Sequence, residues 1–128
     1  MSGVPEHATR VAVVDDDASV CRGLARLLRT SGFAVDTYVS AHEFLGSLAT
    51  STPECLIIDL RMPEMTGLEL HQRLVRTAVH IPTILITAYR DEAIREQARS
   101  AGIHGCLEKP VQEESLVAAI NAATGRVT

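Results

Sequence analysis

The sequence predicts an α/β domain in which helices cover both faces of a parallel β-sheet. Short apolar runs alternate five times with amphipathic stretches, as repeated strand-helix units require. Several of these runs are apolar throughout, which is typical of strands buried on both faces. Four runs stop at chemically active residues, namely Asp15-Asp16-Asp17, Asp59, Thr87 and Lys109. Because parallel strands all end at one edge of a sheet, these side chains predict a single pocket.

The first unit combines a strand over residues 10–14 with a helix from Ala18 to about Thr30. Asp17 is a suitable N-cap for this helix, and Ser31-Gly32 ends it. One face of the helix is apolar, because it carries Val20, Leu24, Leu27 and Leu28. This helical spacing distinguishes the segment from the strand that precedes it.

The second unit begins with a strand over residues 33–38, where apolar and polar residues alternate. Ser40 and Glu43 then have the spacing of a capping box, which predicts a helix to about Ala49. The third strand covers residues 55–58, and its side chains are all apolar. This strand leads directly into the acidic residue of the expected pocket.

Thr66 and Glu69 form a second capping box, and the helix that they open extends to about Thr77. The fourth strand covers residues 83–86. A more polar helix over roughly 91–101 follows this strand. The alternation of strand and helix therefore continues without a break.

Gly102 marks the end of the fourth helix, and residues 104–108 form the fifth strand. The last helix has Glu113 and Glu114 in its first turn, where negative charge interacts favourably with the helix dipole. The chain shows no low-complexity segment and no internal linker. The elements therefore predict five strand-helix units in strict order.

The composition is that of one globular domain. With 128 residues, the chain is long enough to bury a core without disulfides. Its net charge of −4 argues against direct nucleic-acid binding, and no apolar run approaches the roughly 20 residues of a membrane helix. Three cysteines without a C-x-x-C pair favour buried thiols in a reducing compartment, so we expect a cytoplasmic protein.

The acidic residues at the strand ends predict a divalent cation site. Asp15, Asp16 and Asp59 repel one another at neutral pH unless a cation neutralises them. A carboxylate cluster without paired His or Cys favours Mg²⁺ or Mn²⁺ over zinc. Lys109 adds positive charge and Thr87 adds a hydroxyl, which together suit a transferring phosphoryl group. A carboxylate can itself be the nucleophile and form an aspartyl phosphate.

The histidines do not predict a second site. They fall on different predicted elements or in the N-terminal segment, at His7, His42, His71, His80 and His104. A phosphotransfer histidine would need an exposed position on a helical bundle, which the α/β pattern does not provide. We therefore expect these side chains to lie at the surface or at helix ends.

One segment carries a resemblance to a known family. Residues 57–67 read Ile-Ile-Asp-Leu-Arg-Met-Pro-Glu-Met-Thr-Gly. The chain resembles the receiver domain of bacterial two-component response regulators, close to the nitrogen-fixation and nodulation regulators, from about Arg10 to about Ala123. The resemblance implies a flavodoxin-like (βα)5 doubly wound sheet with strand order 2-1-3-4-5. It also implies three segments, which are a flexible N-terminus at 1–9, the domain at 10–124, and a tail or linker start at 125–128.

The resemblance implies a role for each acidic residue. Asp59 would accept a phosphoryl group from a sensor histidine kinase or a phosphotransfer protein. Mg²⁺ would be bound by Asp16, Asp59 and the backbone carbonyl of Arg61. Asp15 would act mostly through metal-bound water. Asp17 lies just beyond this set and is expected to cap the helix.

Lys109 and Thr87 would contact the phosphoryl oxygens, and Lys109-Pro110 is similar to the family's cis peptide. Such receivers usually carry an aromatic switch residue where this chain has Cys106. A thiol cannot make the ring rotation, so we expect the signal to travel through the backbone of 91–101 and 104–108. The surface of these segments and the last helix would change partners, and two copies of the domain would pair through it. The output domain or effector is not given by the sequence.

Two other functions stay open at this point. A phosphatase of the haloacid-dehalogenase type also uses Asp and Mg²⁺, but it typically has a second Asp where this chain has Arg61. A receiver-like interaction module independent of phosphorylation is the other alternative, because Cys106 departs from the usual switch. We also consider a further hypothesis, that Arg61 and Tyr89 slow self-dephosphorylation by their bulk. The competing interpretation is that both are solvent-facing loop residues.

Overall fold

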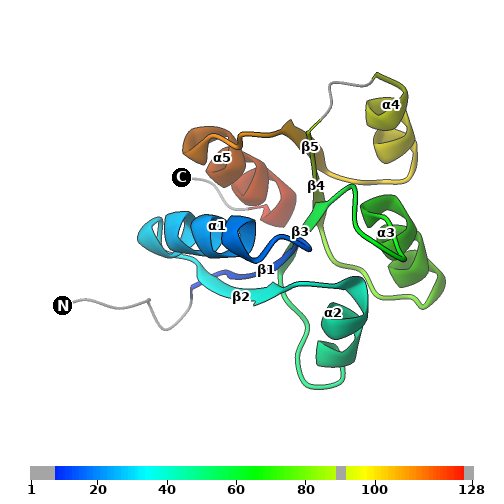
Figure 1. Ribbon diagram of the computed structural model, residues 1–128, viewed down its shortest axis with the longest axis horizontal. Helices are drawn as coiled ribbons and strands as arrows, with labels where there is room; N and C mark the ends of the chain where they lie inside the picture. Colours follow the sequence, from blue (N-terminus) through cyan, green and yellow to red (C-terminus); the bar gives the residue numbers. More distant parts are fainter. Residues whose placement is uncertain (1–7, 89–91, 126–128) are drawn as a thin grey trace.

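The computed structural model describes residues 8–88 and 92–125 of the chain. Within this part, five parallel strands form one sheet in the order β2-β1-β3-β4-β5 (Figure 1). The strands are β1 (Arg10–Val14), β2 (Ala34–Tyr38), β3 (Cys55–Asp59), β4 (Thr83–Thr87) and β5 (Gly105–Glu108). The helices are α1 (Ala18–Thr30), α2 (Ala41–Ser47), α3 (Gly67–Arg76), α4 (Glu92–Ser100) and α5 (Glu113–Thr124). The predicted fold, including its strand order, is confirmed.

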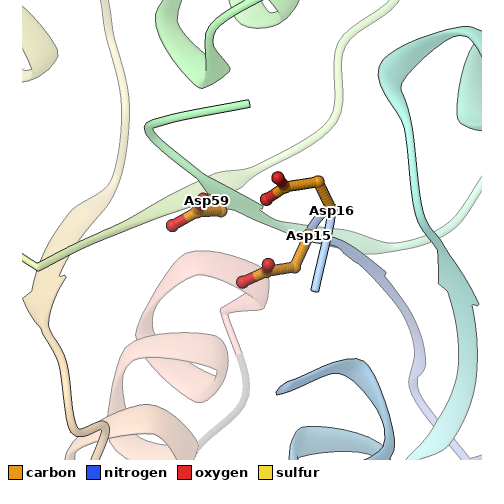
Figure 2. Close-up of side chains that lie close together, drawn as sticks. All are labelled: Asp15, Asp16 and Asp59. Atoms are coloured by element: carbon orange, nitrogen blue, oxygen red, sulfur yellow. The ribbon is translucent and has the colours of Figure 1, made fainter. Parts of the chain in front are cut away.

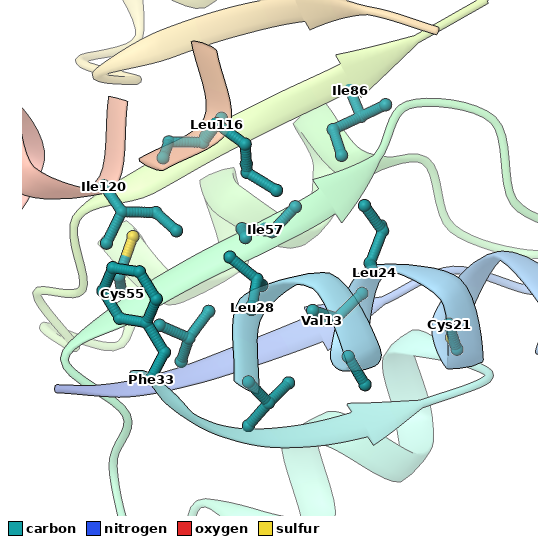
Figure 3. Close-up of a cluster of buried hydrophobic side chains, with 14 residues drawn as sticks. Val13, Cys21, Leu24, Leu28, Phe33, Cys55, Ile57, Ile86, Leu116 and Ile120 are labelled. Atoms are coloured by element: carbon teal, nitrogen blue, oxygen red, sulfur yellow. The ribbon is translucent and has the colours of Figure 1, made fainter. Parts of the chain in front are cut away.

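Helices cover the sheet on both faces, with α1 and α5 on one side and α2, α3 and α4 on the other (Figure 1). A hydrophobic core lies on each face of the sheet, and successive residues of β1 point into the two cores alternately. Val11 and Val13 pack toward α1 and α5, whereas Ala12 and Val14 pack toward the opposite layer. In the first core, side chains of α1 and α5 meet over Ile57 of β3 (Figure 3). Burial on both faces explains why the central strands are apolar throughout.

Two of the predicted helix starts have the expected side-chain caps. Asp17 accepts hydrogen bonds from the backbone N–H groups of Ser19 and Val20, and it caps α1. At α3, the Thr66 hydroxyl accepts from the Glu69 N–H, and the Glu69 carboxylate accepts from the Thr66 N–H. The second capping box is therefore confirmed in both directions.

The predicted capping box of α2 is only half formed. The Ser40 hydroxyl accepts from the Glu43 N–H at 3.0 Å. The Glu43 carboxylate accepts from the N–H of Val39, at 3.4 Å, instead of from Ser40. The helix also ends at Ser47, two residues before the expected end at Ala49.

The start of α3 is packed tightly against the end of β3. The Gly67 N–H donates to the carbonyl of Leu60 at 2.9 Å. A Cβ atom at Gly67 would lie 2.7 Å from the Asp59 carbonyl oxygen and 2.8 Å from Leu85 Cδ1. Glycine is therefore needed here for close approach, and this contact fixes the backbone next to the acidic pocket.

The cysteines follow the sequence prediction in part. Cys21 and Cys55 are buried free thiols, whereas Cys106 is half-buried. Burial raises the pKa of Cys55 to about 12. Burial and the charge of Asp15 also raise the pKa of Cys21. Both buried thiols therefore stay protonated at neutral pH.

The prediction that all histidines lie at the surface or at helix ends was wrong for His71. This side chain lies on α3 and is only 7% exposed. Its Nδ1 atom is buried without a hydrogen-bond partner among the described residues.

In the described part of the chain, no helix has the length and apolar character needed to cross a membrane.

Candidate functional site

The three predicted acids meet at the carboxyl edge of the sheet. Asp59 is the last residue of β3, and Asp15 and Asp16 follow the neighbouring strand β1. Each offers one carboxylate oxygen, and these three oxygens lie within 4.8 Å of one another (Figure 2). Asp15 and Asp59 are 2% and 6% exposed, whereas Asp16 is open to solvent. The structure therefore brings together the acidic residues that the sequence predicts.

Lys109 reaches the same pocket from the end of β5. Its Nζ atom lies 2.9 Å from Asp59 Oδ1 and 3.2 Å from Asp15 Oδ2. Burial alone would lower the pKa of Lys109, but the hydrogen bond to Asp59 and the charges of both carboxylates raise it. The ammonium is therefore charged and held between the two buried acids.

The pocket holds more negative charge than Lys109 can balance. Burial raises the pKa of Asp59, and the nearby charges of Asp15 and Asp16 act in the same direction against the pull of Lys109. Among the described residues, three carboxylates face one ammonium, and all the clustered donors are hard oxygens. This donor set fits a divalent cation that prefers oxygen ligands.

Thr87 ends β4 between the strands that carry Asp59 and Lys109, and its side chain is buried. Its carbonyl accepts the Lys109 N–H at 2.8 Å, so the backbone before the lysine is tied to β4. The Lys109–Pro110 peptide is cis, as the resemblance implied. All four strand-end positions named by the sequence thus lie along one edge of the sheet.

Cys106 lies on β5 opposite Leu85 of β4. Its backbone carbonyl accepts a hydrogen bond from Arg95 Nη1 of α4 at 3.2 Å. The thiol packs at the margin of the core formed with α2, α3 and α4. Burial raises its pKa.

The loop that carries the acids is held by contacts that sequence reasoning missed. The Asp15 N–H donates to the carbonyl of Tyr38 at 3.0 Å. The Asp15 carboxylate accepts the Asp17 N–H at 2.9 Å, and the Asp15 carbonyl accepts from Cys21 Sγ at 3.2 Å. The only signal in the sequence was a cysteine on the apolar side of α1, which is equally typical of a core residue.

Of the two residues in the self-dephosphorylation hypothesis, Arg61 and Tyr89, the structure describes only Arg61. Arg61 follows Asp59 by two positions and is exposed. Tyr89 lies outside the described residues. The hypothesis therefore stays a prediction.

A parallel (βα)5 sheet with this acidic pocket and its lysine defines a phosphoacceptor signalling domain. Residues 11–121 match the response regulator receiver domain family. The chain belongs to this family. It is the receiver of a two-component response regulator, a signalling phosphoacceptor rather than a classical enzyme.

Relatives support this assignment over nearly the whole chain. The response regulator protein TodT of Pseudomonas putida is 37% identical over 92% of this chain and 52% of its own length. Nodulation protein W of Bradyrhizobium diazoefficiens is 38% identical over 97% of this chain and 56% of its own length. The transcriptional regulatory protein FixJ of Azorhizobium caulinodans is 37% identical, over 91% and 55%. The chain thus spans about half the length of these curated relatives.

Solved structures agree with the fold. The structure of FixJ-N superposes with a TM-score of 0.85 at 34% identity, covering 95% of this chain and 98% of that one. A response regulator receiver protein from Burkholderia phymatum gives a TM-score of 0.82 at 41% identity, covering 94% and 98%. The prediction of a receiver close to nitrogen-fixation and nodulation regulators is therefore confirmed.

Proposed function

We propose that Asp59 is the carboxylate that becomes phosphorylated. The single observation that carries this assignment is its position at the end of β3, nearly buried and 2.9 Å from Lys109, beside two further acids. Asp15 and Asp16 belong to the adjacent loop, where Asp15 is engaged through both carboxylate oxygens and Asp16 is open to solvent.

We further propose that the divalent cation is Mg²⁺, with Mn²⁺ as a substitute. Asp16, Asp59 and the backbone carbonyl of Arg61 would bind it directly, and Asp15 would act through water. When bound, the cation supplies positive charge that offsets the charge of the phosphoryl oxygens. The excess of carboxylates over ammonium groups in the pocket supports this set.

In the proposed reaction, Asp59 attacks the phosphorus of a phosphohistidine on the sensor kinase or on a phosphotransfer protein. A P–O bond forms to Asp59 as the P–N bond breaks, and the leaving imidazole keeps the electron pair and takes up a proton. Lys109 exchanges its contacts with the carboxylates for contacts with the new phosphoryl oxygens. The hydroxyl of Thr87 turns inward to donate a hydrogen bond to them.

The proposed output is a change in the surface formed by α4, β5 and α5. The Lys109 N–H to Thr87 carbonyl bond couples the phosphoryl site to the β4–β5 pair, and Arg95 couples β5 to α4. Phosphorylation would shift the population between two arrangements of this surface and favour pairing of two domains through it. The effector is unknown, and we expect neither direct nucleic-acid contact nor membrane attachment by this domain. Family membership supports a cytoplasmic location.

Intact-mass spectrometry after incubation with acetyl phosphate and Mg²⁺ tests the phosphoacceptor. The wild-type chain should gain the mass of one phosphoryl group, and Asp59→Asn should gain none. Labelling of Asp59→Asn to the same extent would overturn the assignment. Sedimentation with and without beryllofluoride tests pairing, and an unchanged mass would count against it.

A further inference from the structure

The proposed metal ligand Asp16 is the least restrained of the three acids. Asp15 and Asp59 are buried and lie within hydrogen-bond distance of Lys109, whereas Asp16 is exposed. Little side-chain packing can therefore fix its carboxylate. Its position depends instead on the two peptide groups that flank it in the chain.

Both of these peptide groups are held by hydrogen bonds. The N–H of the Asp16–Asp17 peptide donates to Asp15 Oδ1 at 2.9 Å. The carbonyl of the Asp15–Asp16 peptide accepts from Cys21 Sγ at 3.2 Å. Because a peptide group is planar, holding one of its atoms restricts the orientation of the whole unit. The peptide groups before and after Asp16 are thus both restrained in orientation.

Cys21 is well placed for this role. It lies in the first turns of α1, it is 2% exposed, and its protonated thiol is a donor. The same sulfur lies 3.7 Å from the carbonyl of Tyr38, which also accepts the Asp15 N–H at 3.0 Å. One side chain therefore connects α1, the acidic loop and the end of β2.

We propose that Cys21 is a positioning residue, whose thiol orients the Asp15–Asp16 peptide and thereby sets the affinity of the acidic pocket for its divalent cation. The inference rests on the proposed role of Asp16 as a metal ligand. It concerns a side chain that does not touch the cation or the phosphoryl group. Substitution of a residue that orients a metal ligand commonly changes the metal affinity, although the ligands themselves stay the same.

Cys55 provides a matched control within the same molecule. Cys21 and Cys55 are both buried in the core formed with α1 and α5, and they lie at opposite ends of it (Figure 3). Cys55 begins β3, whereas the acids lie where β1 and β3 end. Removing either sulfur leaves a similar cavity, but only Cys21 contacts the acidic loop.

The test compares Cys21→Ala, Cys21→Ser and Cys55→Ala in the whole chain. Calorimetric titration gives the Mg²⁺ dissociation constant, and urea unfolding gives the stability of each variant. We expect about three- to tenfold weaker Mg²⁺ binding in Cys21→Ala, the size of one modest hydrogen bond. Cys21→Ser keeps a donor and should bind within about twofold of wild type. Cys55→Ala should lose stability to a similar degree while its Mg²⁺ affinity is unchanged.

A kinetic measurement separates positioning from general destabilisation. In Cys21→Ala, the Mg²⁺ concentration that gives half-maximal phosphorylation by acetyl phosphate should rise, and the rate at saturating Mg²⁺ should be retained. Unchanged Mg²⁺ affinity in Cys21→Ala, or equal weakening in Cys55→Ala, would overturn the inference. Asp16→Asn tests the underlying ligand assignment: if it binds Mg²⁺ like wild type, the proposed ligand set fails, whatever Cys21→Ala shows.

Discussion

The β3–α3 unit and the α4–β5 unit belong to the same sheet, yet they are packed very differently. Every residue of β3 is buried, and α3 buries Gly67, Leu70, His71 and Leu74. The edge strand β5 has no fully buried residue, and α4 buries Ala98 alone. The proposed nucleophile Asp59 therefore lies on the rigid unit, and the proposed signalling surface lies on the unit with few buried contacts. Segments with few buried apolar contacts can change conformation at low free-energy cost.

The largest expected effect is a difference in core packing between the two units. Leu70→Ala on α3 should lower the free energy of unfolding by about 2–5 kcal/mol, because the side chain is fully buried. Ile94→Ala on α4 should cost less than about 1.5 kcal/mol, because that side chain is only half-buried. Urea unfolding of both variants measures the difference. Equal losses would show that α4 is anchored as firmly as α3.

The junction of β3 and α3 gives the next effect. Gly67→Ala should cost about 1–3 kcal/mol, because the added Cβ meets the Asp59 carbonyl and forces the backbone apart. The displaced Asp59 should also accept phosphate from acetyl phosphate more slowly. Gly23→Ala is the control, because a Cβ there meets nothing within 4 Å.

Gly23 lies in the interior of α1, where alanine is more favourable than glycine. Gly23→Ala should therefore raise the free energy of unfolding by about 0.5–1 kcal/mol and keep the wild-type rate of phosphorylation. Stability is measured by urea unfolding and the rate by intact mass over time. If Gly67→Ala has the stability and the phosphorylation rate of wild type, the backbone at the β3–α3 junction can accommodate the added Cβ atom without cost.

A smaller effect concerns the link between α4 and β5. Arg95→Ala removes the donor to the Cys106 carbonyl and should accelerate amide hydrogen exchange in α4 by about fivefold. Arg99→Ala is the control on the same helix, since its guanidinium pairs with Glu96 at the surface. Both variants should accept phosphate at the wild-type rate. Equal exchange in the two variants would remove Arg95 from the proposed path of the signal.

The difference between the two units also explains what could be predicted from the sequence. The strands were recognisable because burial on both faces leaves apolar runs, and the pocket because parallel strands end at one edge. Thr66 and Glu69 were recognisable as a cap because their bonds are local in sequence. Glu43 has an equally local alternative at Val39, which the spacing alone does not reveal.

The sequence missed the contacts of Cys21 and the burial of His71, because both depend on segments that are distant in the sequence. Cys21 reads as an ordinary core residue until β1 and β2 bring the carbonyls of Asp15 and Tyr38 to its sulfur. His71 reads as a polar surface residue, and only the packing around α3 buries it. Tertiary contacts of this kind leave no periodic signal in the sequence.

The smallest expected effect is a pH dependence of stability from His71, which lies on the rigid unit. Burial lowers the pKa of His71 from its ordinary value of 6.5, and the electrostatic interaction with His104 acts in the same direction. Below about pH 6.5 the unfolded chain therefore binds a proton that the folded chain binds less readily, so stability falls as the pH falls. We expect a loss of less than about 1 kcal/mol between about pH 7 and pH 5 from this group.

His71→Leu isolates this contribution, because the other titrating groups are common to both proteins. The substitution also removes the Nδ1 atom that is buried without a partner among the described residues, so the variant should be more stable than wild type at every pH. The difference between the two unfolding free energies should widen as the pH falls from about 7 to about 5, which is the direction required for a group whose folded-state pKa is depressed. Urea unfolding at several pH values measures it. A difference that stays constant would mean that His71 titrates alike in the folded and unfolded chain, and that α3 is less tightly closed around it than its burial indicates.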